Sequence, residues 1–362
     1  MRRHRSAFGL VLMILVLGLM VYGVVPAPAD ELGNPASDPG LSGPRMPDSS
    51  SRIDPDYNYG PGPLQIASQS PAQSFRLTMP PVVPGTIPLG GPSVRIAATW
   101  TNVWAKDFRY LLDYEMLETR VTVSYGVTNR FGLAIAFDQR DYFGGAMDNL
   151  IEEFHDLLGL PQNGRKDFGH NLTQIVLRDD QGNIISVRDD LDGLDNNGIS
   201  FITHYVLHHG TTLSPAIGLT GVLRYGLNTT TGDDDDEPLD LGIGVGLSKR
   251  WADRWYSYGQ LSYTRYGQTN LLGLELKNHA FSGMVAMAWQ WKPNISILGQ
   301  YLFHEGVSEH FGDLSNFSHE VNLGFKWALG RFGLLEFGII ENIIEHDNSP
   351  DLGFHGAYEY RF

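Results

Sequence analysis

Seven charged residues occur where the neighbouring side chains alternate between apolar and polar. Each lies in the polar register of its stretch, as Lys326 does between Phe325 and Trp327. Charged groups aligned on one face of a wall can brace it as ion pairs, or can offer a polar lining that sets the charge preference for a solute. Both roles can hold together, so we take these residues as candidate lining residues of an enclosed polar face: Arg95, Arg224, Glu320, Lys326, Glu336, Glu359 and Arg361.

Two acidic clusters contain the hard oxygen ligands that calcium prefers. One covers residues 189–198 and the other residues 233–237. The first departs from EF-hand spacing, because Leu194 stands where a ligand is needed, and the second has no ordered geometry. We therefore expect solvated loops with neither a cofactor nor a resident metal, and weak calcium binding as the alternative.

No set of residues forms a convincing catalytic constellation. His204, His208 and His209 cluster near a predicted turn, where histidines are usually surface polar residues without a catalytic role. Ser318 and His319 are adjacent, so in a strand their side chains face opposite sides. We expect no catalytic residue, although a hydrolase that pairs Asp and His in the loops is the remaining enzymatic alternative.

The segment 139–197 is too long for a bare loop and should contain structure of its own. Residues 147–158 carry an apolar stripe at helical spacing, and Gly159 and Pro161 follow as stop signals. This helix either folds inward as a constriction or caps its own loop. The candidate constriction residues are Leu150, Ile151, Phe154 and His155.

The elements that position all these residues are predicted to be β-strands, because the dominant period from Ser93 onward is two. In residues 131–138, large apolar side chains alternate with Gly, Ala and Asp. Most predicted strands are near the ~9–11 residues that a tilted membrane strand needs. They cover residues 93–104, 117–127, 130–138, 198–208, 212–226, 239–249, 254–265, 279–291, 295–304, 318–327, 332–343 and 353–362.

Connections and faces indicate a membrane barrel. Short and long connections alternate along the chain, as in outer-membrane barrels. The polar, Gly-rich face cannot fill a dry core, so the apolar face should point outward to lipid. Tryptophans near the predicted strand ends fit two interfacial girdles: Trp100, Trp104, Trp251, Trp255, Trp289, Trp291 and Trp327. The predicted fold is an all-β, antiparallel, up-and-down transmembrane barrel of about twelve strands, with a secreted β-sandwich as the alternative.

The N-terminal quarter of the chain, residues 1–92, has a different composition. Three arginines precede an apolar run at 8–25 and a small-x-small site ending at Ala29, which predicts a signal peptide over residues 1–29. An uncleaved anchor helix is the alternative. Fifteen of the 20 prolines lie between Pro26 and Pro92, which predicts a largely disordered, Pro-rich periplasmic lead-in over 30–92. The barrel then occupies residues 93–362.

Charge and cysteine content exclude several classes of protein. The formal net charge of −15 argues against a nucleic-acid partner, which would require a basic surface. The chain has no cysteine, which excludes disulfides, thiolate metal sites and thiol nucleophiles.

Two motifs resemble known families. Tyr358-x-Tyr360-x-Phe362 resembles the signature that closes many Gram-negative outer-membrane barrels and is read by their assembly machinery. Residues 151–161, followed by Gly164-Arg165, resemble a long-loop segment of the uncharacterised domain-of-unknown-function family 3187. The likeness covers about residue 75 to the C-terminus. It implies a fold and a location, the outer membrane, but no established activity.

These observations predict an outer-membrane barrel with both termini in the periplasm. The expected function is a narrow channel or facilitator for a small solute, with access limited by the loop 139–197. The alternative is a non-conducting surface barrel whose loops bind a partner or lipopolysaccharide, with divalent ions bridging acidic loops to lipopolysaccharide phosphates as a weak-binding variant. The expected partners are outer-membrane lipid, lipopolysaccharide and the barrel assembly machinery.

Overall fold

The computed structural model describes residues 57–88, 91–145, 147–158, 165, 172–189, 191, 196–227, 238–342 and 347–362. All of them belong to one compact unit, Arg52–Phe362. Within these residues, strands dominate and the single α-helix is α2 (Asp148–Leu158). Short 3-10 helices cover Gln73–Phe75, Gly312–Ser315 and Gly330–Phe332.

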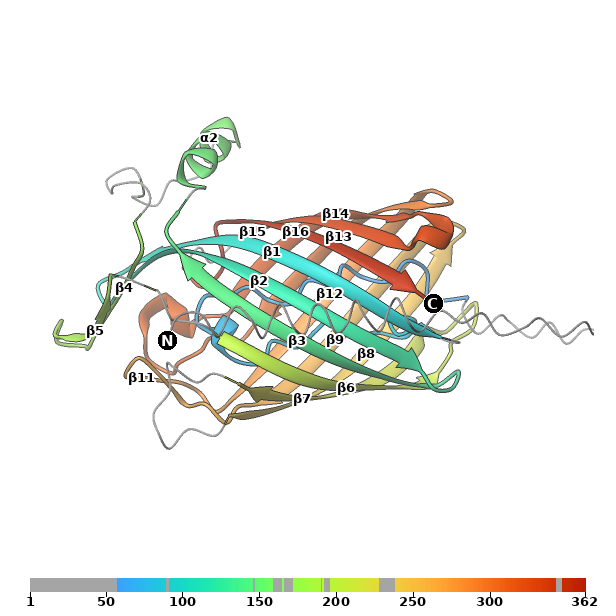
Figure 1. Ribbon diagram of the computed structural model, residues 1–362, viewed down its shortest axis with the longest axis horizontal. Helices are drawn as coiled ribbons and strands as arrows, with labels where there is room; N and C mark the ends of the chain where they lie inside the picture. Colours follow the sequence, from blue (N-terminus) through green and yellow to red (C-terminus); the bar gives the residue numbers. More distant parts are fainter. Residues whose placement is uncertain are drawn as a thin grey trace, which may run out of the picture. The chain divides into compact units, whose positions relative to one another are not determined.

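The described strands form a closed antiparallel barrel (Figure 1). Its sheet has 14 strands, of which β4 and β5 form an appended hairpin and the other twelve make the wall. The sheet closes because β1 pairs with both β16 and β2, so that Trp100 lies opposite Phe354 and Leu117. The predicted twelve-stranded barrel is thus confirmed. The wall consists of β1 (Pro92–Lys106), β2 (Tyr110–Gly126), β3 (Phe131–Phe143), β6 (Asn196–His208), β7 (Ala216–Gly226), β8 (Leu239–Ala252), β9 (Trp255–Arg265), β12 (His279–Lys292), β13 (Ile295–His304), β14 (Ser318–Ala328), β15 (Leu334–Asn342) and β16 (Leu352–Arg361).

The two ends of the barrel differ. The tight connections, such as β2–β3 and β12–β13, gather at one end together with Pro92 and Arg361, which we call the short-turn end. The opposite, long-loop end carries the hairpin of β4 (Gln174–Arg178) and β5 (Ile184–Arg188), which extends the sheet from β2. It also carries the small pair β10 (Asn270–Leu271) and β11 (Leu274–Glu275).

The outer face of the wall is apolar and exposed. On β8, Leu241, Ile243, Val245 and Leu247 are exposed, whereas the intervening residues are buried. A continuous exposed apolar surface of this kind is unfavourable in water but is required against hydrocarbon. Four tryptophans are exposed near the short turns: Trp251, Trp255, Trp291 and Trp327. None of the described helices combines the length and apolarity that a membrane-spanning helix requires.

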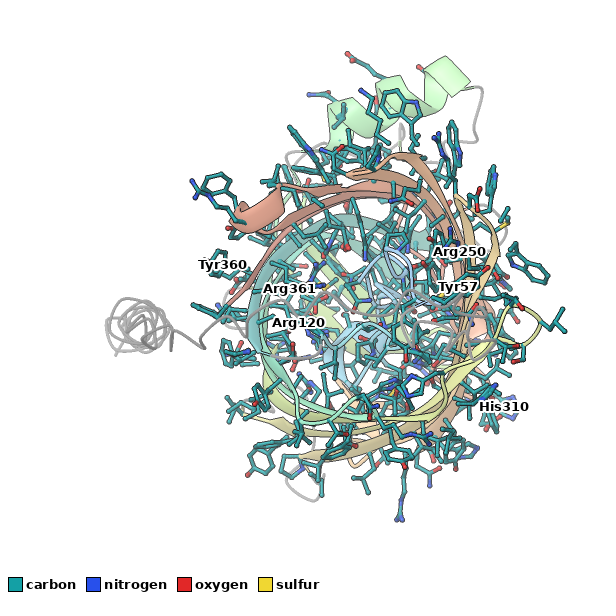
Figure 2. All side chains as sticks on the ribbon, turned by 90° about the vertical axis from the view of Figure 1, so that its right-hand side faces the viewer. Tyr57, Arg120, Arg250, His310, Tyr360 and Arg361 are labelled. Atoms are coloured by element: carbon teal, nitrogen blue, oxygen red, sulfur yellow. The ribbon has the colours of Figure 1, made fainter. Side chains whose placement is uncertain are left out.

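The last strand follows the predicted division of faces. Phe354 and Tyr358 are exposed on the outer face, while His355, Ala357 and Glu359 are buried inside. Viewed along the barrel from the short-turn end, Tyr360 lies outside the ring of strands and Arg361 lies toward its interior (Figure 2).

Residues 57–88 occupy the interior of the barrel, which corrects the prediction of a largely disordered lead-in for this part of 30–92. We call this stretch the internal segment. It enters at the short-turn end, where Tyr57 lies under Arg250, and reaches the long-loop end around Gln73–Phe75. It then returns to Pro92, the first residue of β1 (blue trace in Figure 1).

The internal segment is ordered because the wall supplies the partners that it cannot supply itself. Its apolar side chains pack on inward wall residues, for example Leu64 and Ile66 near Leu298 and Ile340. A closed sheet offers no free edge to pair with an extended chain, so backbone donors must be met by side chains. The segment has seven prolines, each of which removes one such donor.

An apolar core fills the long-loop end and receives the tip of the internal segment through Ala72 and Phe75. We call it the apolar cap. Phe75 stacks on Tyr142 with ring centroids 4.9 Å apart. Inward residues of β1 and β2 meet loop residues here, and the remaining members are Val103, Ala105, Tyr110, Leu112, Tyr114, Met116, Ile175, Leu177, Leu191, Leu271, Leu274, Leu276, Val307, Phe311 and Leu314.

Candidate functional site

The interior contains a charged cluster centred on Glu336 of β15. Its carboxylate lies 2.6 Å from the Arg95 guanidinium, 3.1 Å from Lys326 Nζ and 3.2 Å from His355 Nε2. It also accepts a hydrogen bond of 2.8 Å from the backbone N–H of Gln65 in the internal segment. Removing a carboxylate from such a buried cluster would leave uncompensated cations. Three predicted lining residues, Arg95, Lys326 and Glu336, therefore act together.

Lys326 and Glu320 hold the internal segment directly. Lys326 Nζ donates to the carbonyl oxygens of Pro61 and Pro63 at 3.0 and 2.7 Å. Glu320, on β14, accepts hydrogen bonds from the Ser68 hydroxyl and from the backbone N–H of Gln69. Both wall residues thus satisfy polar groups of a chain that has no sheet edge to pair with.

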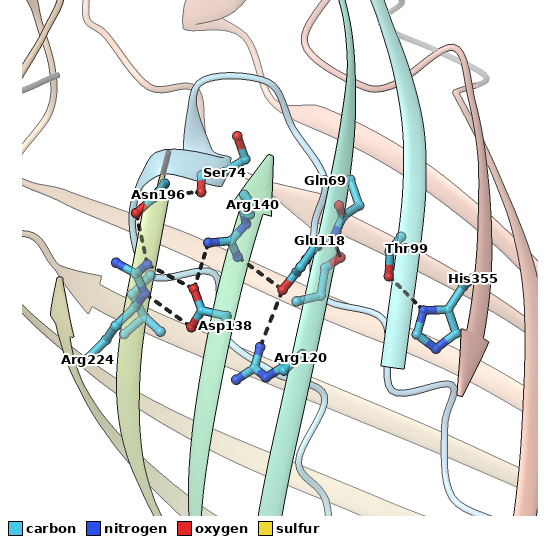
Figure 3. Close-up of polar contacts among 12 residues, drawn as sticks. Gln69, Ser74, Thr99, Glu118, Arg120, Asp138, Arg140, Asn196, Arg224 and His355 are labelled. Carbon is cyan, nitrogen blue, oxygen red and sulfur yellow. Dashed lines mark hydrogen bonds and ion pairs between the residues drawn. The ribbon is translucent and has the colours of Figure 1, made fainter. Parts of the chain in front are cut away.

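A second charged network crosses β2, β3 and β7 nearer the long-loop end (Figure 3). Arg224 donates to Asp138 at 2.9 Å, and Arg140 donates to Asp138 at 3.0 Å and to Glu118 at 3.2 Å. Glu118 also accepts from Gln69 Nε2 at 2.8 Å, which links the network to the internal segment. The predicted lining residue Arg224 is therefore fully engaged in ion pairing.

Four charged residues of this network were not among the predicted lining residues: Glu118, Arg120, Asp138 and Arg140. They stand in the same registers as the small inward residues Ser124 and Ala136, which is the signal that could have identified them. The predicted bounds began β2 at 117 and ended β3 at 138, so the pairing of Glu118 with Arg140 fell outside them.

The last two predicted lining residues lie at the short-turn mouth. Arg361 donates to Glu359 at 2.8 Å, and 56% of its side chain is exposed, compared with 11% for Glu359. Both border a cavity of about 360 Å³ that the wall shares with Gly60 and Pro61 of the internal segment. A smaller cavity of about 80 Å³ lies deeper, between the internal segment and β1–β3, and Glu359 borders both.

The predicted constriction helix does not line the interior. Ile151 of α2 is fully buried in a cluster with Met147 and Leu352, against which Trp100 packs. Leu352 and Trp100 belong to the outward registers of β16 and β1, so α2 contacts the outside of the wall, away from the barrel axis (Figure 1). Leu150 is exposed, and the side chains of Phe154 and His155 lie outside the described residues.

Arg165 fixes this loop to the outer rim of the barrel. It donates to Asp148 at 2.9 Å, to Asp351 at 2.6 Å and to Asn102 at 2.6 Å. Its guanidinium also lies over Trp104, with 5.3 Å to the ring centroid. This explains why Trp104 is buried under the loop, whereas tryptophans at the short-turn end are exposed.

The acidic loops proposed as calcium sites fall mainly outside the described residues, including all of 233–237. Among the residues that the structure describes, no group of three or more His, Asp or Glu side chains is placed to hold a metal ion.

A closed barrel with an apolar outer band and a polar, charged interior defines a transmembrane β-barrel of the outer-membrane type. The chain belongs to the family described as Protein of unknown function (DUF3187), which matches residues 52–362. The match begins before residue 75, so it includes the internal segment.

Solved structures with a similar fold include outer-membrane channels and porins. An outer membrane channel from Pseudomonas putida F1 is 11% identical with a TM-score of 0.49, over 78% of this chain and 100% of that one. The KdgM porin is 8% identical with a TM-score of 0.39, over 75% and 99% of the two chains. The toluene transporter TodX of Pseudomonas putida is 9% identical with a TM-score of 0.35, over 75% and 88%. No curated protein sequence matches this chain.

Proposed function

We propose that the protein is a narrow outer-membrane channel for a small solute, with the internal segment 57–88 limiting passage. The observation that carries this proposal is how the segment is held: wall side chains meet its backbone at several points along both arms, by hydrogen bonds that water can replace. Helix α2 of loop 139–197 packs on the outer side of the wall, so we assign the limiting role to the internal segment instead.

These hydrogen bonds continue along both arms of the internal segment. On the outgoing arm, the N–H of Gly62 donates to the Tyr258 hydroxyl at 3.0 Å. On the returning arm, the N–H of Leu77 donates to Asp240 at 2.8 Å, and the N–H of Val82 donates to Gln260 at 2.8 Å. Exchange of such a bond for bonds to water costs about 0.5–1.5 kcal/mol net for a neutral partner and about 1.5–3 kcal/mol for a charged one. The segment can therefore shift within the barrel without breaking the wall.

The topology of the segment also supports a movable plug. Both of its ends lie at the short-turn end, so the hairpin can retract in that direction while every strand stays paired. In the proposed orientation this end, with Tyr57 and Phe362, faces the periplasm.

A second candidate function is a non-conducting surface barrel whose loops bind a partner or lipopolysaccharide. The apolar cap favours it, because this core closes the long-loop end with residues such as Tyr110 and Phe311, which are almost completely buried. Passage through the barrel requires the cap to open or to leave a path beside it.

Planar-bilayer conductance and the swelling of solute-loaded liposomes separate the two candidates. The full-length protein should give small, infrequent current steps, and a variant lacking residues 57–88 should give large and lasting ones. That variant keeps all twelve strands, and migration of the unheated protein on a gel verifies that its barrel has formed. Silence of both proteins in both assays would refute the channel and leave the surface barrel.

A further inference from the structure

The deeper of the two interior cavities has an unusual lining. It measures about 80 Å³ and lies between the returning arm of the internal segment, Pro80–Ile87, and the inner faces of β1, β2 and β3. By this measure one water molecule needs about 10–15 Å³, so the cavity has room for a small solute. Two guanidinium groups border it, those of Arg95 and Arg120.

Arg95 has a buried nitrogen without a partner. Its Nη2 atom donates to Glu336 at 2.6 Å, but Nη1 is buried and finds no hydrogen-bond acceptor among the described residues. Buried donors in native proteins are nearly always satisfied, so an unpaired one in a cavity wall indicates a missing acceptor.

The Arg120 guanidinium also lacks a carboxylate within hydrogen-bond distance. The nearest carboxylate, Glu118, lies 4.0 Å away, which is too far for a hydrogen bond, and it already accepts from Arg140 and Gln69 (Figure 3). Arg120 stands opposite Ala97, and Arg95 stands opposite Thr122, so the two arginines are diagonal neighbours on paired strands. Side chains at such positions can reach the same small ligand.

The rest of the lining suits an anion. Ser93 and Ser124 contribute hydroxyls that bond to each other at 2.6 Å, and Thr122 lies beside them. Glu359 is the one acidic residue among the described lining residues, and it is already paired with Arg361. Two cations thus face the cavity with one compensated carboxylate, and guanidinium groups bind carboxylates and phosphates particularly well.

The deeper cavity and the cavity at the short-turn mouth share a lining residue. Glu359 borders both cavities, and the 360 Å³ mouth cavity also presents Lys326, Arg331 and Arg361. An anion approaching from this side meets positive charge first at the mouth and then at the deeper pair.

We propose that the cavity between Arg95 and Arg120 binds a small anion, a phosphate or a short carboxylate, which enters from the short-turn mouth. The claim that the bound anion is also the transported solute rests on the proposed function, whereas binding itself does not. The anion would accept hydrogen bonds from Arg95 Nη1 and from Arg120, and it would lie directly against the returning arm of the internal segment.

Equilibrium binding to the full-length protein in detergent tests this proposal, with inorganic phosphate and acetate as probes and glucose as the neutral control. We expect one of the two anions to bind and glucose not to bind. Arg120→Gln should weaken anion binding by about tenfold or more, because a charge-assisted hydrogen bond is lost. Arg120→Lys should restore part of it, since the charge is kept.

Arg130→Gln is the matched control, because it removes the same charge from an exposed position at the β2–β3 turn. It should leave binding unchanged. Arg95 is a poorer target, since its removal would also strip Glu336 of a partner. Gel migration of the unheated protein checks that each variant has formed its barrel.

Absence of binding by both anions, or equal binding in the wild type and in Arg120→Gln, would overturn the site. Conductance is measured on the same proteins, so that the two proposals fail separately. Anion binding without any current would retain the site and refute the channel. Current without anion binding would retain the channel and refute the site.

Discussion

The internal segment 57–88 lies inside the barrel and the helix α2 lies outside it, and the sequence did not predict either location. The Pro-rich segment was expected outside the barrel and without order, yet it fills the interior. The apolar-striped helix of the long loop was expected either as an inward constriction or as a cap over its own loop, and it packs on the outside of the wall through Ile151 and Leu352. Whether each element lies inside or outside the wall is decided by the residues that are available to pack against it in the folded barrel.

Each partner has a physical description. The segment presents backbone carbonyls, few N–H groups and scattered apolar side chains, and the inner wall offers Lys326, Tyr258 and Gln260 to match them. The helix presents one narrow apolar stripe, which needs an apolar surface outside the polar interior. Trp100 and Leu352 provide that surface at the outer rim.

The largest effect is expected from Glu336→Gln, which breaks the segment's anchor. It leaves Arg95 and Lys326 without their shared buried carboxylate, at a cost of about 3–5 kcal/mol in the free energy of unfolding. Urea unfolding followed by gel migration measures it. Glu275→Gln, at an exposed position on β11, should change the midpoint little. Equal midpoints for both variants would contradict a central role for Glu336.

The next prediction displaces the internal segment with one side chain. A Cβ atom at position 246 would lie 2.8 Å from the carbonyl oxygen of Val82 and 3.0 Å from the Cα atom of Val83, so Gly246→Val leaves no room for the returning arm. Such overpacking typically costs ~1–3 kcal/mol. We expect protease cleavage within 57–88 to rise about tenfold, and current steps to become more frequent.

Gly299→Val is the control for this substitution. Gly299 lies in the outward register of β13, where an added Cβ atom would meet only Leu323, at 3.7 Å. It should leave both cleavage and current as in the wild type. A segment that stays protected in Gly246→Val would show that it does not pass as closely as the structure indicates.

The third prediction concerns the other side of the comparison. Ile151→Ala removes the side chain that docks α2 on the outer wall, and core truncations of this kind cost about 2–5 kcal/mol. Cleavage within 147–158 should rise, while current should not change. Leu150→Ala, at the exposed neighbouring position, should change neither. An increase in current with Ile151→Ala would instead support a gating role for loop 139–197.

A smaller effect is expected from pH at the loop between β15 and β16. Burial, with the nearby acidic side chains, raises the pKa of Asp347 to about 6, and the Tyr110 hydroxyl donates to its carboxylate at 2.7 Å. The ordered loop therefore holds its proton better than an unperturbed aspartate, whose pKa is 3.8. Stability of the loop is greatest below about pH 4 and falls as pH rises through 6.

Hydrogen exchange of residues 347–351 measures this dependence. In the wild type, the exchange rate corrected for the intrinsic rate should be higher at pH 7 than at pH 5. Asp347→Asn should abolish the difference, because the amide does not titrate. A difference that persists in this variant would assign the effect to another group.

Much of the wall could be predicted because lipid outside and polar contents inside force strict alternation. The predicted strand bounds are wrong where the wall no longer separates lipid from a polar interior. In β2, predicted over 117–127, the strand continues back to Tyr110 with apolar Leu112 and Tyr114 inward and charged Asp113 and Glu115 outward. There the apolar cap replaces the polar interior and the loop with Arg165 covers the outside, so the register signal is reversed.

The sequence allowed us to predict that these charged residues face the interior, but not which of them contact one another. The register of each strand places Arg95 and Glu336 inside, yet their contact depends on which strands are neighbours and on the stagger between them. The internal segment gave no periodic signal, because its order depends on side chains of strands far along the chain, such as Glu336, which lies 271 residues from Gln65. Our proposal that this segment limits passage therefore rests on the structure, because the sequence pattern did not indicate it.

A reversible lock on the internal segment tests the central claim most directly. The chain has no cysteine, and a Cβ atom at position 338 would lie 2.8 Å from Ile66 Cδ1, the end of a side chain that Ile66→Cys shortens, so the pair Ile66→Cys and Gly338→Cys can approach disulfide geometry. Single-channel current of the full-length double variant is recorded oxidised and after reduction, with each single variant as a control. If the segment limits passage, current steps vanish on oxidation and return on reduction. Steps of equal size and frequency in both states would contradict the account.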